Sequence, residues 1–335
     1  MTVLRAPASS GAARGAAQES VRNADLRAEA IAGLTARKKS LAPKWLYDER
    51  GSALFERITG LPEYYPTRTE TAILRRHAAQ LGSLVPPGGA LVELGSGASV
   101  KTRILLDAGA HFGAYVPIDI SPEFLTRTAE DLRRRYRDLP IIPLTGDFSR
   151  PLNLPGAALD LPKIGFFPGS TIGNLDPAAA RALLERVRGW PGTEGFILGV
   201  DLVKDPEELV AAYDDAQGVT AAFISNILVR LNREAGANFD PDAFAYEALW
   251  NAELARIDMR LVSTRKQVVD LSGTRIDFAA DEPIHVSASR KYTGDSLAAL
   301  ATAAGWRVAQ SFADEGNRFL VACLVPDRPS SGTES

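Results

Sequence analysis

The chain has 335 residues, of which 45% are hydrophobic and 24% are charged, and its formal net charge is −3. This length allows one large domain or two smaller ones with a sizeable core. The small negative charge gives no general attraction to nucleic acid or to an acidic membrane surface. No apolar run approaches the roughly 20 residues of a membrane span. We therefore expect a cytoplasmic protein that binds neither nucleic acid nor membrane.

Cysteine and histidine usage narrows the chemistry. The single cysteine, Cys323, lies in the apolar segment RFLVACLV. One thiol cannot form an intramolecular disulfide, which fits a reducing compartment, and its neighbours predict a buried strand residue. The histidines His77, His111 and His285 are far apart and lack metal-ligand spacing. No bound metal is expected.

Both ends of the chain have a composition typical of segments without a packed core. Residues 1–23 are rich in Ala, Gly and Ser, which predicts a disordered leader. Residues 328–335, with the sequence RPSSGTES, predict a disordered tail.

From residue 90 onward, short β-type runs alternate with helical stretches. The predicted strands are apolar runs that cover residues 90–95, 114–121, 141–148, 163–169 and 195–202. The predicted helices between them cover residues 100–110, 122–138 and 176–189. This alternation predicts an α/β fold with a parallel sheet, doubly wound by right-handed crossovers. A helix and a strand over residues 296–314 precede a last strand, residues 318–325, which we expect to be antiparallel.

Two regions do not follow this alternation of strands and helices. Residues 24–67 are helical with interspersed aromatic residues, and residues 204–290 begin with helices and end in β-type segments. We expect these regions to form a second, α+β domain. Residues 68–203 and 291–327 would then form the sheet domain.

The segment VELGSGASVKT contains the first ligand signal. It places Gly95 and Gly97 directly after the first predicted strand, with Glu93 before the turn. Glycines there allow a sharp turn and a close approach of a ligand to the backbone, at the edge where open parallel sheets bind ligands. The dinucleotide fingerprint G-x-G-x-x-G is incomplete, because Val100 stands at its third glycine.

Two acids follow the next strands. Asp119 ends the second predicted strand, where a carboxylate can accept both hydroxyls of a ribose. Asp147 and Phe148 follow the third strand, where the acid could hydrogen-bond an adenine amino group and the ring could stack on it. Together with the glycine turn, they predict a nucleoside-type ligand and resemble the S-adenosylmethionine (SAM) site of class I methyltransferases. A nicotinamide dehydrogenase is the alternative, but no hydride-positioning group is evident.

The segment FFPGSTIGNLDP, residues 166–177, resembles a buried strand that ends abruptly in a loop. Its Gly-Ser-Thr stretch would suit a phosphate or a small zwitterion, although the G-x-x-x-x-G-K-[ST] pattern of a P-loop is absent. From the residues alone, Asn174 is explained equally well as a ligand contact or as a residue at a helix N-terminus.

Four segments resemble the histidine Nα-methyltransferase of ergothioneine biosynthesis and its relatives. They are LYDERGSALFERITGLPEYYPTRTE, VELGSGASVKTRILLDA, FFPGSTIGNLDP and DLVKDPEELVAAYDDAQGVTAAF. The resemblance covers about residues 41–325. It implies a class I, Rossmann-like methyltransferase domain and a substrate-binding second domain that closes over an amino acid. The implied enzyme uses SAM to methylate the α-amine of a free amino acid up to the trimethyl betaine, and we expect a monomer.

The resemblance also implies roles for individual residues. The cofactor contacts would be Glu93, Gly95, Ser96, Gly97, Lys101, Asp119, Asp147 and Phe148. The amino-acid contacts would be Tyr47, Tyr64, Asn174, Tyr213, Met259, Ser287 and Ser289. Asn174 resembles the asparagine that anchors the head group, so the loop would hold a zwitterion, and Tyr213 resembles the tyrosine that holds the carboxylate. Tyr47 and Asn174 would orient the α-amine with no clear general base, and Tyr65 is the alternative to Tyr64.

One position departs from the family pattern. Where the histidine enzyme has a glutamate and, two residues later, a serine facing the imidazole, this chain has Ser287 and Ser289. Losing the carboxylate removes a charge-assisted hydrogen bond, should weaken imidazole recognition by about 1–3 kcal/mol, and opens volume. Histidine remains the expected substrate. The alternatives are a larger aromatic amino acid (Trp, Tyr or Phe) and a non-catalytic protein that binds amino acid or cofactor.

Overall fold

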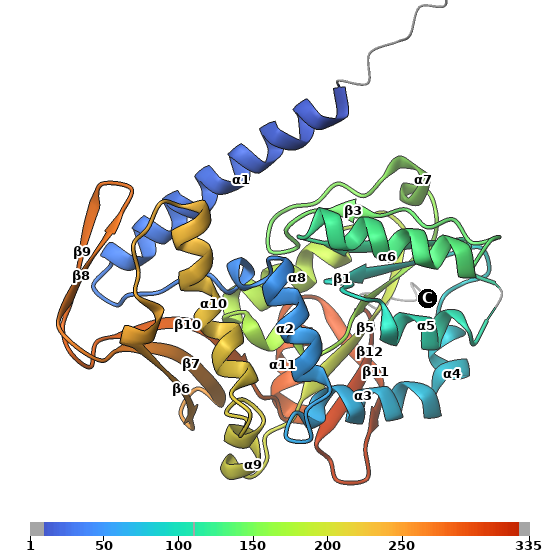
Figure 1. Ribbon diagram of the computed structural model, residues 1–335. Coiled ribbons are helices and arrows are strands. Elements are labelled where there is room, and N and C mark those ends of the chain that lie inside the picture. Colours follow the sequence, from blue (N-terminus) through green and yellow to red (C-terminus); the bar gives the residue numbers. More distant parts are fainter. Residues whose placement is uncertain (1–9, 110, 328–335) are drawn as a thin grey trace, which may run out of the picture. The chain divides into compact units, whose positions relative to one another are not determined.

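The computed structural model describes residues 10–109 and 111–327, whose elements are labelled in Figure 1. They form two compact units. The small unit comprises the chain up to Gly51, Gly218–Glu247 and Met259–Ser287. The large unit comprises Ser52–Gln217, Ala248–Asp258 and the chain from Ala288 onward.

The large unit is built on one seven-stranded sheet with the strand order β11-β12-β5-β4-β1-β2-β3. The first five strands of the chain pair in parallel, whereas β12 runs antiparallel to both β5 and β11. The expected α/β class and the antiparallel last strand are therefore confirmed. The strands are β1 Ala90–Leu94, β2 Ala114–Asp119, β3 Leu144–Thr145, β4 Lys163–Phe167, β5 Thr193–Asp201, β11 Trp306–Ala313 and β12 Phe319–Pro326.

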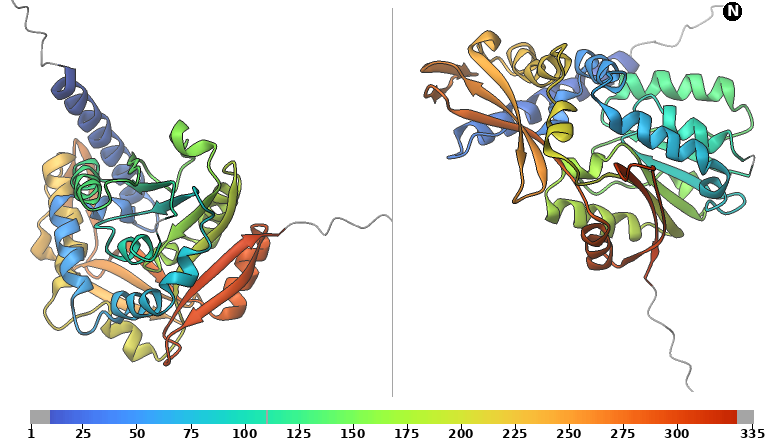
Figure 2. Two further views of the ribbon diagram at one scale, coloured as in Figure 1. Left: turned by 90° about the vertical axis from the view of Figure 1, so that its right-hand side faces the viewer. Right: turned by 90° about the horizontal axis from the view of Figure 1, so that it is seen from below.

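Helices cover both faces of this sheet, because parallel strands must be joined by crossovers. In the right-hand view of Figure 2, α8 and α11 lie on one face, and α3 to α6 lie on the other. The helices of this unit are α3 Tyr65–Arg76, α4 Ala78–Gly82, α5 Val100–Leu106, α6 Pro122–Arg135, α7 Gly156–Leu159, α8 Pro177–Arg188, α9 Pro206–Ala211 and α11 Gly294–Ala303, with the 3₁₀ turn η2 Thr171–Asn174.

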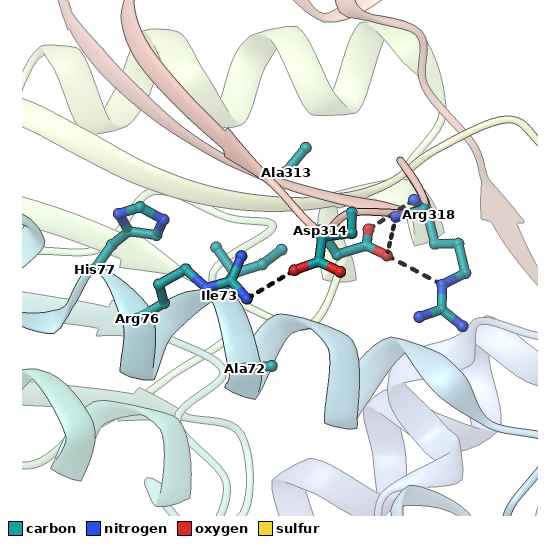
Figure 3. A pocket seen from close by; sticks show the side chains of 9 residues that line it. Ala72, Ile73, Arg76, His77, Ala313, Asp314 and Arg318 are labelled. Carbon is teal, nitrogen blue, oxygen red and sulfur yellow. Dashed lines mark hydrogen bonds and ion pairs between the residues drawn. The ribbon is translucent and has the colours of Figure 1, made fainter.

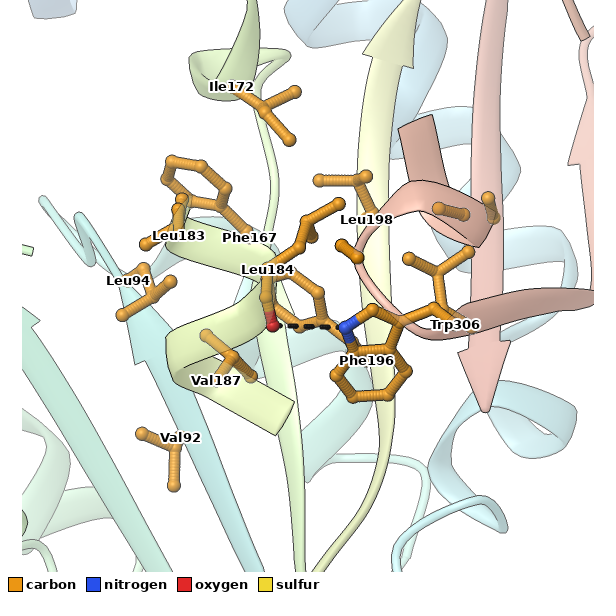
Figure 4. Packing of buried hydrophobic residues seen from close by; sticks show 14 of the residues in the cluster. Val92, Leu94, Phe167, Ile172, Leu183, Leu184, Val187, Phe196, Leu198 and Trp306 are labelled. Carbon is orange, nitrogen blue, oxygen red and sulfur yellow. Dashed lines mark hydrogen bonds between the residues drawn. The ribbon is translucent and has the colours of Figure 1, made fainter. Parts of the chain in front are cut away.

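Alternate residues of the strands supply two cores, one on each face of the sheet. In the core beneath α8 and α11, Phe167, Phe196 and Trp306 pack together, and the indole N–H donates to the carbonyl oxygen of Leu184 at 3.0 Å (Figure 4). Cys323 is buried in β12, as expected, and burial raises its thiol pKa to about 12. These cores make the sheet a rigid frame for the loops at its carboxyl edge.

The small unit contains an aromatic cluster. Phe239, Phe244 and Phe278 meet edge to face, and the Phe244–Phe278 centroids are 5.2 Å apart. Its elements are α1 Ser10–Thr35, η1 Pro43–Leu46, α10 Val219–Glu234, η3 Pro241–Ala243, β8 Gln267–Leu271 and β9 Thr274–Phe278. Four elements contain residues of both units: α2 Glu49–Thr59 and the strands of the sheet β10-β7-β6, which are β6 Phe244–Asn251, β7 Arg256–Ser263 and β10 Pro283–Arg290.

The segment expected to be a disordered leader, residues 1–23, is described only in part. Residues 1–9 lie outside the described residues, and residues 10–23 belong to α1, which begins at Ser10. The alanine content that suggested disorder also suits a helix, because alanine has the highest intrinsic helix propensity. The tail expected over residues 328–335 also lies outside the described residues.

The unit boundaries differ from the expected domains in four segments. Residues 52–67, 204–217, 248–258 and 288–290 belong to the large unit, whereas the sequence pattern assigned them to the second domain. The contacts explain this placement. The Tyr65 hydroxyl donates to the carboxylate of Asp201 at the end of β5, and Nζ of Lys291 donates to the Tyr213 hydroxyl at 2.8 Å.

Candidate active site

The turn after β1 carries the two glycines that the sequence singled out. Gly95 and Gly97 have φ angles of +65° and +49°, a region that favours glycine. A Cβ on Gly95 would lie 3.4 Å from Cε1 of Phe148, so this turn and the segment after β3 are neighbours. The Ser96 hydroxyl is buried and has no hydrogen-bond partner among the described residues. An unsatisfied buried hydroxyl costs about 1–3 kcal/mol, so the turn suits a polar ligand.

Asp119 ends β2 and is held against the same turn. Its Oδ2 accepts from the backbone N–H of Gly97 at 2.9 Å, and its Oδ1 accepts from that of Ser121 at 3.0 Å. Burial raises the pKa of this carboxyl, and the backbone hydrogen bonds oppose the rise. Each carboxylate oxygen has a further lone pair, so the group can also accept from ligand hydroxyls.

Asp147 and Phe148 follow β3, and Phe148 lies next to Gly95. The Oδ1 of Asp147 accepts from the backbone N–H of Ser149 at 2.9 Å, which fixes a tight turn. The ring of Phe148 meets that of Phe167 edge to face, with centroids 5.2 Å apart. The structure therefore brings the glycine turn, Asp119 and Phe148 to one edge of the sheet, as the sequence predicted.

Glu93 lies inside the fold, beneath the glycine turn. Its side chain is buried in β1, and its Oε2 accepts from the hydroxyls of Thr102 at 2.5 Å and of Tyr115. Burial raises its pKa to about 8, against smaller lowering by the two hydrogen bonds. Glu93 thus links β1, β2 and α5, and the cofactor contact expected of it stays a prediction.

We expect Glu93 to make the fold less stable as the pH rises. Its pKa is raised from 4.5 to about 8 in the folded chain, so the folded chain keeps a proton that the unfolded chain releases in this window. The corresponding stabilisation is complete below about pH 4.5 and is lost as the pH rises through about 8. The side chain of Glu93→Gln stays neutral at all pH values. The free energy of unfolding of this variant should therefore rise relative to that of the original chain by about a few kcal/mol between pH 5 and pH 8.5. Urea unfolding of both proteins at these pH values measures this change. If the difference between their unfolding free energies stayed constant with pH, Glu93 would not have the raised pKa.

A buried carboxylate joins α5, the helix after the glycine turn, to the loop after β4. Glu70 of α3 is fully buried, and its Oε2 accepts from Nζ of Lys101 at 2.5 Å and from the backbone N–H of Gly169 at 2.8 Å. The sequence reading missed Glu70. The available signal was its position three and four residues before Ile73 and Leu74, on the apolar face of the helix.

The loop over residues 168–174 is fixed from a second side as well. The Ser170 hydroxyl oxygen accepts from the backbone N–H of Asp201 at 2.9 Å. A Cβ on Gly173 would lie 2.6 Å from the carbonyl oxygen of Arg290, closer than such atoms approach. Only glycine therefore allows this loop to lie against the end of β10.

Asn174 is the last residue of η2 and is half-buried. Its side chain makes no hydrogen bond to another described residue. The helix after it is capped by Asp176, whose Oδ1 accepts from the backbone N–H of Ala179 at 2.8 Å. Asn174 is therefore not the N-cap of α8, and its amide has hydrogen-bonding capacity for a ligand.

The neighbouring tyrosines 64 and 65 have different surroundings. The hydroxyl of Tyr65 donates to the carboxylate of Asp201 at 2.8 Å, and the ring is fully buried. The ring of Tyr64 meets that of Tyr213 edge to face, with centroids 5.9 Å apart. Tyr64 thus shares the surroundings of Tyr213, whereas Tyr65 links α3 to β5.

Tyr213 and Ser289 belong to a buried polar group that we call the Lys291 cluster: Asp201, Lys204, Tyr213, Ser289 and Lys291. Nζ of Lys291 donates to Asp201 at 2.7 Å, to Tyr213 at 2.8 Å and to Ser289 at 2.9 Å. Lys204 donates to the other oxygen of Asp201 at 2.6 Å. The sequence reading missed Asp201 and both lysines, although an acid at the end of a predicted buried strand was a usable signal.

The predicted substrate contacts fall into two sets. Tyr64, Asn174, Tyr213 and Ser289 lie in the large unit, whereas Tyr47, Met259 and Ser287 lie in the small unit. The ring of Tyr47 meets Phe223 of α10 edge to face at a centroid distance of 5.5 Å. The side chains of Met259 on β7 and Ser287 on β10 are buried.

A separate surface pocket of about 200 Å³ lies beside α3 and the β11–β12 turn (Figure 3). Its charged groups pair with one another: Arg76 contacts Glu315 at 3.2 Å, and Arg318 contacts Asp314 at 3.1 Å. None of the predicted site residues lines it. In the part of the chain that the structure describes, no group of three or more His, Cys, Asp or Glu residues is arranged to hold a metal ion, and no helix could span a membrane.

Several known proteins are similar in sequence to this chain. The model of a family described as histidine-specific, SAM-dependent methyltransferases matches residues 26–326. Histidine N-alpha-methyltransferase from Mycobacterium tuberculosis is 42% identical over 305 residues, covering 88% of this chain and 92% of that protein. The enzyme of the same name from Mycolicibacterium smegmatis is 42% identical over 313 residues, covering 90% and 94%. A more distant relative, 4-dimethylallyltryptophan N-methyltransferase from Trichophyton verrucosum, is 26% identical over 302 residues, covering 85% and 88%.

Proposed function

We propose that this chain, which belongs to the family of SAM-dependent, histidine-specific methyltransferases, methylates the α-amine of free L-histidine up to the N,N,N-trimethyl betaine. The observation that carries the proposal is the 42% identity to histidine N-alpha-methyltransferases over nearly the whole chain. The geometry of the large unit supports it, because Glu70 joins Lys101 of α5, a proposed cofactor contact, to the loop that ends in Asn174. Family membership also decides against the dehydrogenase and the non-catalytic binder.

The residues at the carboxyl edge of the sheet fit S-adenosylmethionine. The unsatisfied hydroxyl of Ser96 and the glycine backbone would contact its polar groups. Asp119 would accept from the ribose hydroxyls, and Asp147 and Phe148 would hold the adenine. When bound, the cofactor supplies an electrophilic methyl group on a sulfonium. The absence of the third glycine of the dinucleotide fingerprint agrees with a ligand that has no pyrophosphate.

The residues around the loop over 168–174 would orient the amino acid. The Asn174 amide can accept from an ammonium and donate to a carboxylate, and Tyr213 would hold the carboxylate. Tyr47 and Tyr64 would lie near the amine and the methyl group. Holding the amine nitrogen in line with the methyl group is the main catalytic effect, because orientation of reactants lowers the barrier by several kcal/mol. The amine would react in its neutral form after losing a proton to water or a tyrosine.

A second candidate is the same chemistry on a larger aromatic amino acid. Ser287 stands where the family pattern has a glutamate for the imidazole, and a buried serine leaves more volume than a glutamate. A tryptophan-derivative methyltransferase is among the relatives of this chain. The two candidates share all of the proposed cofactor and head-group contacts and differ only in what contacts the side chain of the substrate.

Incubation with SAM and each proteinogenic amino acid tests both candidates. We expect histidine to gain mass in steps of about 14 Da, up to three steps, as the resemblance implies. Ser287→Glu should raise kcat/KM for histidine relative to tryptophan by about 10-fold or more, because it restores a charge-assisted contact worth about 1–3 kcal/mol.

A matched control for that variant is Ser311→Glu, a change of the same kind at an exposed position of β11. It should leave the preference unchanged. Methylation of tryptophan but not histidine by the original chain would establish the second candidate. Methylation of no amino acid would contradict both.

A further inference from the structure

Glu70 is a fully buried carboxylate that is paired with a lysine. Its side chain is 0% exposed, and Nζ of Lys101, a residue that is 16% exposed, lies 2.5 Å from its Oε2. The carboxylate fits against β5 because Gly199 has no side chain, and a Cβ there would lie 2.1 Å from Oε1 of Glu70. A buried charge is costly unless it is paired. Glu70 and Lys101 therefore form a unit whose net charge is zero.

The ammonium group of Lys101 has donors to spare. An ammonium has three N–H donors, and Lys101 uses one of them for Glu70. In the part of the chain that the structure describes, Lys101 makes no second hydrogen bond. A Cβ on Gly169 would lie 3.5 Å from Nζ, so the ammonium borders the loop after β4. Two donors therefore remain for a ligand near this loop.

The charge of Lys101 also acts on the strand that leads into the glycine turn. It influences Glu93 of β1. Glu93 does not offset this charge at neutral pH, because burial raises its pKa to about 8 and the group keeps its proton. Glu70, which is ion-paired with Lys101, does offset it.

The cofactor and its product differ in charge. S-adenosylmethionine carries a positive sulfonium, whereas S-adenosylhomocysteine, which remains after the methyl group has left, has an uncharged sulfur. The two molecules share the adenine, the ribose, the amine and the carboxylate. A change of charge beside the cofactor therefore alters their relative affinity, whereas the loss of a contact to a shared group weakens the binding of both.

We propose that Glu70 is a positioning residue that cancels the charge of Lys101 and so sets the preference of the site for the cationic methyl donor over its uncharged product. This inference rests on the proposed function, which places the cofactor beside Lys101. Held by the carboxylate, the ammonium can donate to the cofactor without adding net charge near the sulfonium. Without Glu70, the same ammonium would repel the sulfonium and favour the product.

The test compares the dissociation constants of SAM and S-adenosylhomocysteine, both measured by calorimetry. Glu70→Gln keeps the size of the side chain and an acceptor for the N–H of Gly169, but it removes the charge. We expect the ratio of the SAM constant to the product constant to rise by about 10-fold. Two unit charges about 10 Å apart, at an effective dielectric constant of about 20, change a binding constant by roughly this factor.

A second substitution separates charge from structural damage. Adding Lys101→Met to Glu70→Gln removes the unpaired cation. The ratio should then return to about that of the original chain, even though both dissociation constants rise. An unchanged ratio in Glu70→Gln would overturn the proposal, and so would a double variant that kept the raised ratio.

Glu185→Gln is the matched control. Glu185 pairs with Arg181 on α8 at 2.7 Å, but these side chains are 46% and 55% exposed. Water therefore screens the charge that this substitution leaves unpaired, and the ratio should stay unchanged.

Glu70→Ala gives the same test if Glu70→Gln does not fold. If neither folds while Glu185→Gln does, Glu70 serves the fold and the proposal is overturned. The proposed function itself fails only if the original chain methylates no amino acid, which is measured independently of this ratio.

Discussion

Replacement of Asn174 with alanine is expected to reduce kcat/KM for histidine by about 100-fold or more, and to leave the affinity for SAM unchanged. The Asn174 amide is half-buried and makes no hydrogen bond to another described residue, so truncation should not damage the fold. It would remove both hydrogen bonds to the amino-acid head group, each worth about 1.5–3 kcal/mol when the partner is charged. Initial-rate kinetics over a histidine titration and calorimetry with SAM measure the two effects.

A variant two residues away separates binding from local stability. Asp176→Ala removes the N-cap of α8 and should cost about 1 kcal/mol of stability. Unlike Asn174→Ala, it should leave the KM for histidine nearly unchanged. If the two variants gave the same loss of kcat/KM, or if Asn174→Ala bound histidine with unaltered affinity, the role proposed for Asn174 would be refuted.

Asp201→Asn is expected to lower the free energy of unfolding by about 3–5 kcal/mol, because it leaves two buried ammonium groups without their carboxylate. Asp201 is fully buried, its carboxylate accepts from Lys204 and Lys291, and it also accepts from the Tyr65 hydroxyl. Lys291 forms its ion pair with Asp201 at 2.7 Å, and both side chains are 0% exposed. Urea unfolding, followed by circular dichroism, measures the loss.

The control for this prediction is an ion pair of similar length on the surface. Asp277 and Arg275 of β9 lie 2.8 Å apart but are largely exposed. Exposed pairs of this kind contribute little, because water screens them. Asp277→Asn should therefore leave the unfolding curve almost unchanged. If Asp201→Asn lowered the free energy of unfolding as little as Asp277→Asn does, the Lys291 cluster would not be a buried charge network.

Much of the sheet was predictable because its signals are local. The strand–turn–helix pattern around Gly95 and Gly97 and the acid at 119 are short-range features, and the topology of a parallel sheet brings strand ends to one edge. Asp176 rather than Asn174 caps α8 because Pro177 opens the helix, a distinction that the loop sequence did not settle. Composition alone does not distinguish an alanine-rich helix such as α1 from a disordered segment.

The polar groups that hold the site together were not predictable, because their partners are remote in sequence. Glu70 contacts Gly169, 99 residues away, and Lys291 contacts Asp201, 90 residues away. A charged residue within an amphipathic helix or at the end of a strand usually faces water. Only the packed fold shows that these two are buried and paired.

Glu70 has a consequence for how kinetic data on this enzyme are interpreted. Its one carboxylate holds Lys101, a proposed cofactor contact, and the Gly169 amide of the loop proposed to hold the amino acid. With those roles, a substitution at this position would perturb two binding equilibria at once. Apparent Michaelis constants for the methyl donor and the amino acid would then move together, and neither could be attributed to a contact with its own ligand.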